Sequence, residues 1–234
     1  MSNIKLYLSL TSKALSVNNI YEEPGRFKDT YLALTSVEFA SYIRHVFVDN
    51  TPYMFREVPL LFKNIIYYIA EELNLDYHDV LLIGSAKTGF SMSPDSYGKK
   101  FSENRDLDFT IINEKLFSRL EIEFGLWKEQ YIHDLLVPNE IEKKYWNDNL
   151  IRVPKNLDKG FIDSTKIPNK ELFKLTRQIN QMLYLILYKL KEYYNIKNKK
   201  ASIRIYKNWE CFQKQLILNT NNILNTVERK RDVK

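Results

Sequence analysis

A short apolar run followed by a glycine and a serine, with two aspartates further along, constrains this chain more than any other feature. Val80–Ile83 is four apolar residues long and is followed directly by Gly84 and Ser85. Such a run, bounded by a turn residue, is typical of a buried strand. Asp106 and Asp108 then open a second β-rich run. The sequence therefore predicts two strands with polar residues placed at their ends.

The two aspartates fall on the same side of their predicted strand. Side chains alternate between the two faces of a strand, so Asp106 and Asp108 point one way while Leu107 and Phe109 point into the core. The two carboxylates then lie about 6–7 Å apart along the strand and repel each other. A divalent cation would relieve that repulsion, and a Gly-Ser turn offers backbone N–H groups and a hydroxyl to a phosphate.

Periodicity predicts helices around these strands. Apolar residues recur every three or four positions in 57–73, 114–136, 171–195 and 209–227, and Ser36 with Glu38 is expected to begin a helix over 36–47. A short strand is expected over 201–206. Residues 137–170 contain Pro138, Pro154, Pro168 and Gly160, so short strands and turns are expected there instead of helices. The charged tail 228–234 is expected to fray.

The predicted fold class is α+β, with a small mixed sheet flanked by helices and a helical C-terminal half. We expect an N-terminal segment (1–55) packed on the core, a core that carries the motif (56–170) and a helical region (171–234). Residues 89–104 are polar and contain Pro94 and Gly98. They are predicted to form a long loop, and long loops inside compact domains are often binding loops.

Composition excludes several kinds of site and leaves the partner open. Cys211 is the single cysteine, so no internal disulfide or cysteine zinc site can form, and the three histidines lack metal-ligand spacing. The net charge of +6 permits contact with phosphates or nucleic acid without requiring it. The start of the chain lacks signal-peptide features, and the apolar stretch 182–190 is too short to span a bilayer. We expect a cytoplasmic protein with no membrane partner.

Taken together, the motif resembles the signature of the DNA polymerase beta-like nucleotidyltransferase superfamily. In that signature a Gly-Ser at a strand–helix turn is followed by two aspartates separated by one residue, here Gly84-Ser85 and Asp106-Leu107-Asp108. The resemblance covers residues 56–113. It implies a nucleotidyltransferase-like sheet and a metal-dependent enzyme that moves a nucleotidyl group from a nucleoside triphosphate to a hydroxyl.

The resemblance also implies roles for individual residues. Gly84 and Ser85 would grip the β- and γ-phosphates, and Asp106 and Asp108 would hold Mg²⁺ or Mn²⁺. Lys87 and Ser91, in the segment after the turn, are further candidates for the triphosphate. The alternative is that Lys87, like Lys99, is simply an exposed lysine.

A third carboxylate completes the family's site, as a general base or a further metal ligand. Asp163, which ends the short apolar run Phe161-Ile162, is the candidate, and its alternative role is to cap the following turn. Glu121 and Glu123 are rivals inside a helical pattern. An absent third acid would indicate a slow enzyme or a catalytically silent module.

The chain departs from the family's pattern at two points. Arg105 precedes the first aspartate where Ser or Thr is usual, and it would clamp a phosphate or neutralise the aspartate pair. The segment between Gly-Ser and the aspartates is also longer than usual. These departures put the acceptor half of the site in doubt.

The acceptor is open: a nucleic acid, a nucleotide, a protein or a small molecule. Short members of the superfamily are often prokaryotic, with roles in toxin–antitoxin or phage-defence systems. A partner protein encoded nearby is a further expectation for this chain. A second hypothesis is a catalytically silent nucleotide- or RNA-binding subunit on the same fold. Tyr145-Trp146 would stack a base or, as the alternative, belong to the core.

Overall fold

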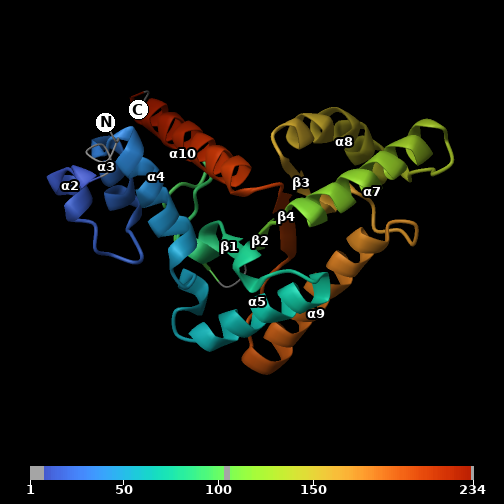
Figure 1. Cartoon of the computed structure of the whole chain (residues 1–234), viewed down its shortest axis with the longest axis horizontal. Helices are drawn as coiled ribbons and strands as arrows, with labels where there is room; N and C mark the ends of the chain where they lie inside the picture. The colour runs from blue at the N-terminus through green and yellow to red at the C-terminus, as the bar shows by residue number, and fades with distance from the viewer. Residues whose placement is uncertain (1–7, 103–105, 233–234) are drawn as a thin grey trace. The chain divides into compact units, whose positions relative to one another are not determined.

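The computed structural model describes residues 8–102 and 106–232 and has a mixed α and β architecture (Figure 1). Arg105, one of the two departures noted above, lies outside the described residues. The α-helices of the described chain are α2 (Ser12–Leu15), α3 (Pro24–Ala33), α4 (Ser36–Arg44), α5 (Pro59–Leu73), α6 (Ser85–Thr88), α7 (Glu114–Ile132), α8 (Glu140–Asp158), α9 (Lys174–Tyr194) and α10 (Trp209–Asp232). The strands are β1 (Val80–Ile83), β2 (Leu107–Ile112), β3 (Phe161–Asp163) and β4 (Ala201–Tyr206).

The strands form one mixed sheet in the order β1-β2-β4-β3. β2 and β4 are parallel, with Asp108 opposite Ser202 and Thr110 opposite Arg204. β3 runs antiparallel to β4 and places Asp163 opposite Arg204. This confirms the predicted mixed sheet, and it puts β4 in the interior of the sheet.

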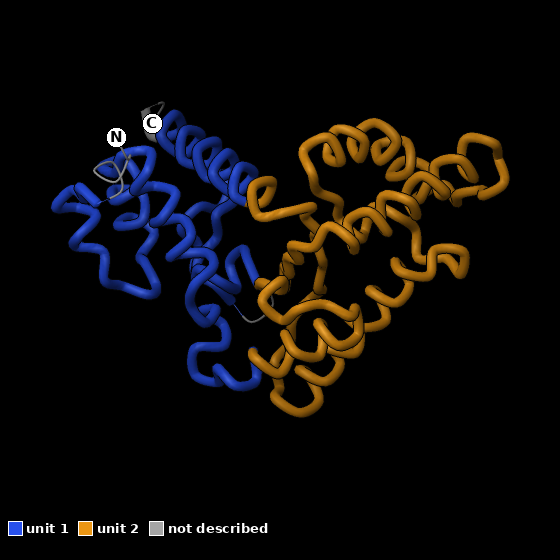
Figure 2. The backbone as a smooth tube through the Cα atoms, in the orientation of Figure 1, with its two compact units in different colours: residues 1–62, 82–105, 213–234 blue, residues 63–81, 106–212 orange. Residues whose placement is uncertain are grey.

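The chain divides into two compact units that are interleaved in sequence (Figure 2). Unit 1 comprises residues 1–62, 82–105 and 213–234, and unit 2 comprises residues 63–81 and 106–212. The division falls inside α5, β1 and α10. The motif is therefore split, because Gly84 and Ser85 belong to unit 1 while Asp106, Asp108 and Asp163 belong to unit 2.

Unit 1 has an aromatic core that joins segments far apart in the sequence. Its buried residues include Phe27, Phe47, Phe90 and Leu224. α10 is tied to this unit by ion pairs, such as Lys28 Nζ to Glu228 Oε1 at 3.2 Å. These contacts explain why the helix continues to Asp232, so the expected fraying from 228 is wrong.

In unit 2, α7 and α9 pack on the sheet and bury its apolar face. The residues of that face alternate along each strand, as the period of a strand requires, and they are at most 1% exposed: Leu107, Phe109, Ile111, Ile162, Ile203 and Ile205. The other face carries the polar residues of the motif.

Local signals explain most of the helix ends. Thr35, one residue before the predicted Ser36, caps α4 in a capping box with Glu38. At α7, the Asn113 side chain accepts a hydrogen bond from the Leu116 N–H at 3.0 Å. α9 ends at Asn195 in the left-handed conformation.

The expectation for residues 137–170 is wrong over α8. This helix begins with a capping box of Asn139 and Glu142 and contains Pro154 near its C-terminal end. One missing N–H there is tolerated because Trp146, Asn149 and Val153 anchor the helix from the buried side. The short strand predicted to end at Asp163 is present as β3.

Among the described residues, no helix combines the length and apolar character needed to cross a membrane.

Candidate active site

The polar face of the sheet in unit 2 carries the two aspartates of the motif. Asp106 precedes β2 and Asp108 is its second residue. Ser202, opposite Asp108 on β4, donates a hydrogen bond from Oγ to Asp108 Oδ1 at 2.9 Å. Lys200 Nζ lies 3.3 Å from Asp106 Oδ2. The starts of β2 and β4, together with the residue before each strand, therefore bring a carboxylate pair, a hydroxyl and an ammonium group together.

Burial perturbs the pKa of the Asp108 carboxyl. Desolvation raises the pKa of its carboxyl above the usual value, and the neighbouring Asp106 charge raises it further. The hydrogen bond from Ser202 and the charges of Arg204 and Lys200 act in the opposite direction without cancelling the effect. A half-buried carboxyl with a raised pKa beside a second acid is typical of functional sites.

Asp163 is engaged by an arginine. Arg204 holds it in a bidentate pair, with Nε 2.7 Å from Oδ1 and Nη2 3.2 Å from Oδ2. Its guanidinium also lies over the ring of Phe161, 4.9 Å from the centroid. Burial alone lowers the pKa of Arg204, but Asp163 outweighs burial and the net pKa is raised. Asp163, on β3, is thus the charge partner of Arg204, on β4. In the sheet, β4 lies between β3 and β2.

The rivals for the third carboxylate are placed elsewhere. Glu123 accepts hydrogen bonds from the N–H groups of Leu175 and Thr176, at 2.7 and 3.0 Å, and so caps the start of α9. Glu121 is exposed on α7. Within residues 8–102 and 106–232, no three or more Asp, Glu, His or Cys side chains form a group that could hold a metal.

The Gly-Ser turn has the expected local form in unit 1. Gly84 adopts φ 71° and ψ −159°, a conformation that side chains rarely allow. Ser85 follows as the first residue of the single-turn helix α6 and is half-buried. β1 therefore ends in a strand–turn–helix, as the motif predicts.

Lys87 and Ser91 are both buried and form hydrogen bonds within unit 1. Lys87 is only 3% exposed, and its Nζ donates to the carbonyl oxygens of Val48 (3.2 Å) and Asn50. Ser91 is buried as well, and its Oγ bonds Ser96 Oγ at 2.8 Å. A nucleotide could use either group only after these bonds had broken. Lys99, in contrast, is exposed.

The aromatic pair of α8 divides between core and surface. Trp146 is 4% exposed and meets Trp127 edge-on at 5.8 Å, whereas Tyr145 is 64% exposed. The core interpretation is therefore confirmed for Trp146 alone.

Sequence reasoning missed the partners of the aspartates on β4. A lone serine in a strand carries no signal, and Ser202 is 94 residues from Asp108 in the sequence. Only the parallel register of β2 and β4 reveals the pair. The pair could be predicted only if the pairing of the two strands were known, because Ser202 then stands opposite Asp108.

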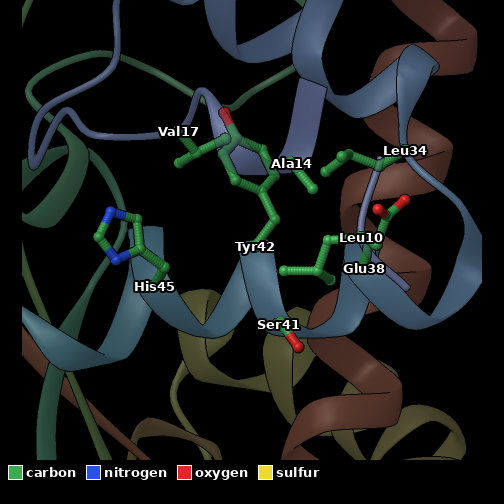
Figure 3. Close-up of a pocket in the computed structure, with 8 residues that line it drawn as sticks. All are labelled: Leu10, Ala14, Val17, Leu34, Glu38, Ser41, Tyr42 and His45. Atoms are coloured by element: carbon green, nitrogen blue, oxygen red, sulfur yellow. The ribbon is translucent and has the colours of Figure 1, made fainter. Parts of the chain in front are cut away.

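Unit 1 contains a separate pocket of about 200 Å³ that the sequence did not indicate (Figure 3). Leu10, Val17 and Leu34 contribute apolar walls. The Glu38 carboxylate at its edge is occupied, because it accepts hydrogen bonds from the N–H groups of Thr11 (2.5 Å) and Thr35 (2.9 Å). Glu38 therefore has a structural role in unit 1, and we do not assign it a catalytic one.

No protein-family model matches the chain, and comparisons with curated proteins and with solved structures found no match.

Proposed function

We propose that this protein is a metal-dependent nucleotidyltransferase that moves a nucleotidyl group from a nucleoside triphosphate to a hydroxyl acceptor. The observation that carries the proposal is the carboxylate pair of Asp106 and Asp108 on one face at the start of β2. Keeping two carboxylates close together, one of them half-buried, costs stability, and a catalytic use of the pair explains that cost.

The two aspartates fit a divalent metal of the Mg²⁺ class. Mg²⁺ prefers oxygen ligands and is bound by one or two carboxylates together with substrate phosphates and water. Asp106 and Asp108 would hold it, and a bound metal would neutralise charge on the triphosphate as the bond to the α-phosphorus changes. Lys200, which now balances Asp106, would then be released toward the substrate's negative charge.

The Gly-Ser turn of unit 1 enters the proposal through the sequence motif and its own backbone conformation. Only a glycine comfortably adopts the backbone angles of residue 84, and the absence of a side chain there lets a phosphate approach the backbone closely. Ser85 adds a hydroxyl donor. We assign these two residues to the β- and γ-phosphates.

The acceptor hydroxyl must lose a proton, and the proposal includes no third acid for this step. Asp163 is held by Arg204 through two hydrogen bonds, so we do not assign it as the base for the acceptor. We therefore expect slow turnover relative to enzymes that place three acids together.

The test measures transfer of label from each of the four α-³²P-labelled nucleoside triphosphates, with Mg²⁺ or Mn²⁺, to RNA, DNA, nucleotide and protein acceptors. The Asp106→Asn/Asp108→Asn variant should lose transfer. Asp158→Asn, an exposed aspartate at the end of α8, is the matched control and should keep it. Equal incorporation by wild type and the double variant would refute the proposal.

A second candidate is a catalytically silent nucleotide- or RNA-binding subunit that acts with a partner protein, in a toxin–antitoxin or phage-defence setting. It is favoured by the pairing of Asp106 with Lys200 and of Asp163 with Arg204. This candidate predicts triphosphate or RNA binding without turnover. Equilibrium binding by the wild type, measured beside the transfer assay, separates the two functions.

A further inference from the structure

Exposed tyrosines and lysines occur in the C-terminal half of α9 and in the segment after it. Tyr184, Tyr188 and Tyr193 are 66%, 46% and 69% exposed. The aromatic–basic surface is defined here as Tyr184, Tyr188, Tyr193, Lys189, Lys191 and Lys197. All six side chains belong to unit 2 and are exposed.

Two rings of this surface, Tyr184 and Tyr188, form a stacked pair. Tyr184 and Tyr188 lie one helical turn apart and are nearly parallel, with an interplanar angle of 18° and centroids 6.4 Å apart. Lys189 Nζ stands 4.6 Å from the centroid of the Tyr193 ring. Exposed apolar groups that lie next to one another mark interaction sites more often than single exposed residues do.

The charge of this region is strongly positive. Residues 189–200 contain five lysines and a single acid, Glu192, which pairs with Lys191 at 3.8 Å. Lysines that alternate with exposed rings match a single-stranded polynucleotide, because its phosphates attract ammonium groups and its unpaired bases stack on aromatic faces. An acidic protein would satisfy the lysines but would leave the rings unused.

The basic segment leads directly to the aspartates. Lys200 ends it with its Nζ 3.3 Å from Asp106 Oδ2, and its carbonyl oxygen accepts the Leu107 N–H at 2.9 Å. β4 begins at the next residue. A strand bound along the lysines therefore has one end close to the acids proposed to perform the transfer.

We propose that the aromatic–basic surface binds single-stranded nucleic acid and that this strand is the acceptor whose terminal hydroxyl receives the nucleotidyl group. This inference rests on the proposed function. In the reaction, the acceptor oxygen forms a bond to the α-phosphorus, the bond from that phosphorus to the bridging oxygen breaks, and pyrophosphate leaves with the hydroxyl proton passing to solvent.

Binding is tested by fluorescence anisotropy with labelled 20-nucleotide single strands of RNA and of DNA, and with a duplex. Tyr184→Ala/Tyr188→Ala should weaken single-strand binding about tenfold or more for each ring. Lys189→Ala/Lys191→Ala/Lys197→Ala should weaken it and also reduce the slope of log affinity against log salt by up to about two. The RNA and DNA arms show which sugar is preferred.

The matched control is Tyr67→Ala/Lys143→Ala/Lys144→Ala, which removes an exposed tyrosine from α5 and two exposed lysines from α8 in the same unit. Its binding should equal that of the wild type. The inference is overturned if the surface variants bind like this control, or if the duplex binds as tightly as the single strands. Tryptophan emission of every variant verifies that unit 2 is folded.

The transfer assay separates failure of the inference from failure of the proposed function. Asp106→Asn/Asp108→Asn should bind the strand normally and transfer nothing, which supports both. Transfer to the strand at wild-type rates by the surface variants overturns the inference alone. If the wild type binds the strand through this surface but transfers nothing, both the acceptor role of the strand and the proposed enzymatic function are overturned.

Discussion

Breaking the Arg204–Asp163 pair should destabilise unit 2 much more than breaking a surface ion pair. The two hydrogen bonds measure 2.7 and 3.2 Å, and the side chains are 32% and 19% exposed. Exposed pairs contribute about 0–1 kcal/mol, and removing one partner of a fully buried pair costs about 3–5 kcal/mol. Arg204→Leu, which also gives up the contact with Phe161, should therefore cost about 2–3 kcal/mol in the free energy of unfolding.

Urea unfolding followed by tryptophan emission measures this effect in the correct unit. The chain has three tryptophans, and all of them fall in unit 2: Trp127, Trp146 and Trp209. For a unit of this size, a loss of 2–3 kcal/mol corresponds to a fall in Tm of about 4–12 °C.

A double-mutant cycle isolates the pair from the packing of its two side chains. Arg204→Leu, Asp163→Leu and the combined variant should give a coupling energy of about 1–2 kcal/mol, because the double variant leaves no unpaired charge. A coupling energy below about 0.5 kcal/mol would refute the structural role. So would an Asp163→Asn variant that keeps full stability and loses all nucleotidyl transfer, since that result would return Asp163 to catalysis.

Three further outcomes are expected. Two hydrogen bonds from backbone N–H groups lower the pKa of Glu38 from 4.5 to about 2. The contribution of its carboxylate to the free energy of unfolding is therefore fully present above pH 4.5 and is lost as the pH falls through about 2. Glu38→Gln should flatten the fall in stability between these pH values, and an unchanged acid limb in urea titrations would contradict this. Gly89→Ala should destabilise unit 1 by at least about 1–2 kcal/mol, because φ is +86° and the added Cβ would lie 2.7 Å from a ring carbon of Tyr53; Gly125→Ala, on α7 with open space around it, is the control in thermal scans. Saturating Mg²⁺ should raise the Tm of the wild type and leave that of Asp106→Asn/Asp108→Asn unchanged, and an equal shift in both would exclude these carboxylates as ligands.

Local patterns predicted the strands and most of the helices because the information lies within a few residues. The apolar runs at β1 and β2 and the three- and four-residue periodicity of α5, α7 and α9 each decide a structure locally. Pro154 misled the prediction for α8 because a proline near the end of a helix costs one hydrogen bond, while the buried side chains that compensate for it are not visible in a propensity argument.

The surroundings of the candidate site were much less predictable. Lys87 follows the motif closely and has the right chemistry for a phosphate, but its use in unit 1 depends on carbonyl groups 37 and 39 residues away. Asp163 has a suitable spacing after an apolar run, but the antiparallel register of β3 and β4 gives it to Arg204. Such pairings are set by the sheet, so a single sequence identifies candidate acids without identifying their partners.

β4 connects the two proposals in physical terms. Lys200, which directly precedes the strand, balances Asp106, and Ser202, its second residue, donates to Asp108. Lys200 is also the last residue of the basic segment 189–200, so that segment ends at the group that balances Asp106. A polyanion that engages Lys200 would draw it away from Asp106 and leave that carboxylate uncompensated, which increases the attraction of the pair for a divalent cation. Strand binding and Mg²⁺ binding should therefore be positively coupled, and by linkage each should tighten the other by the same factor.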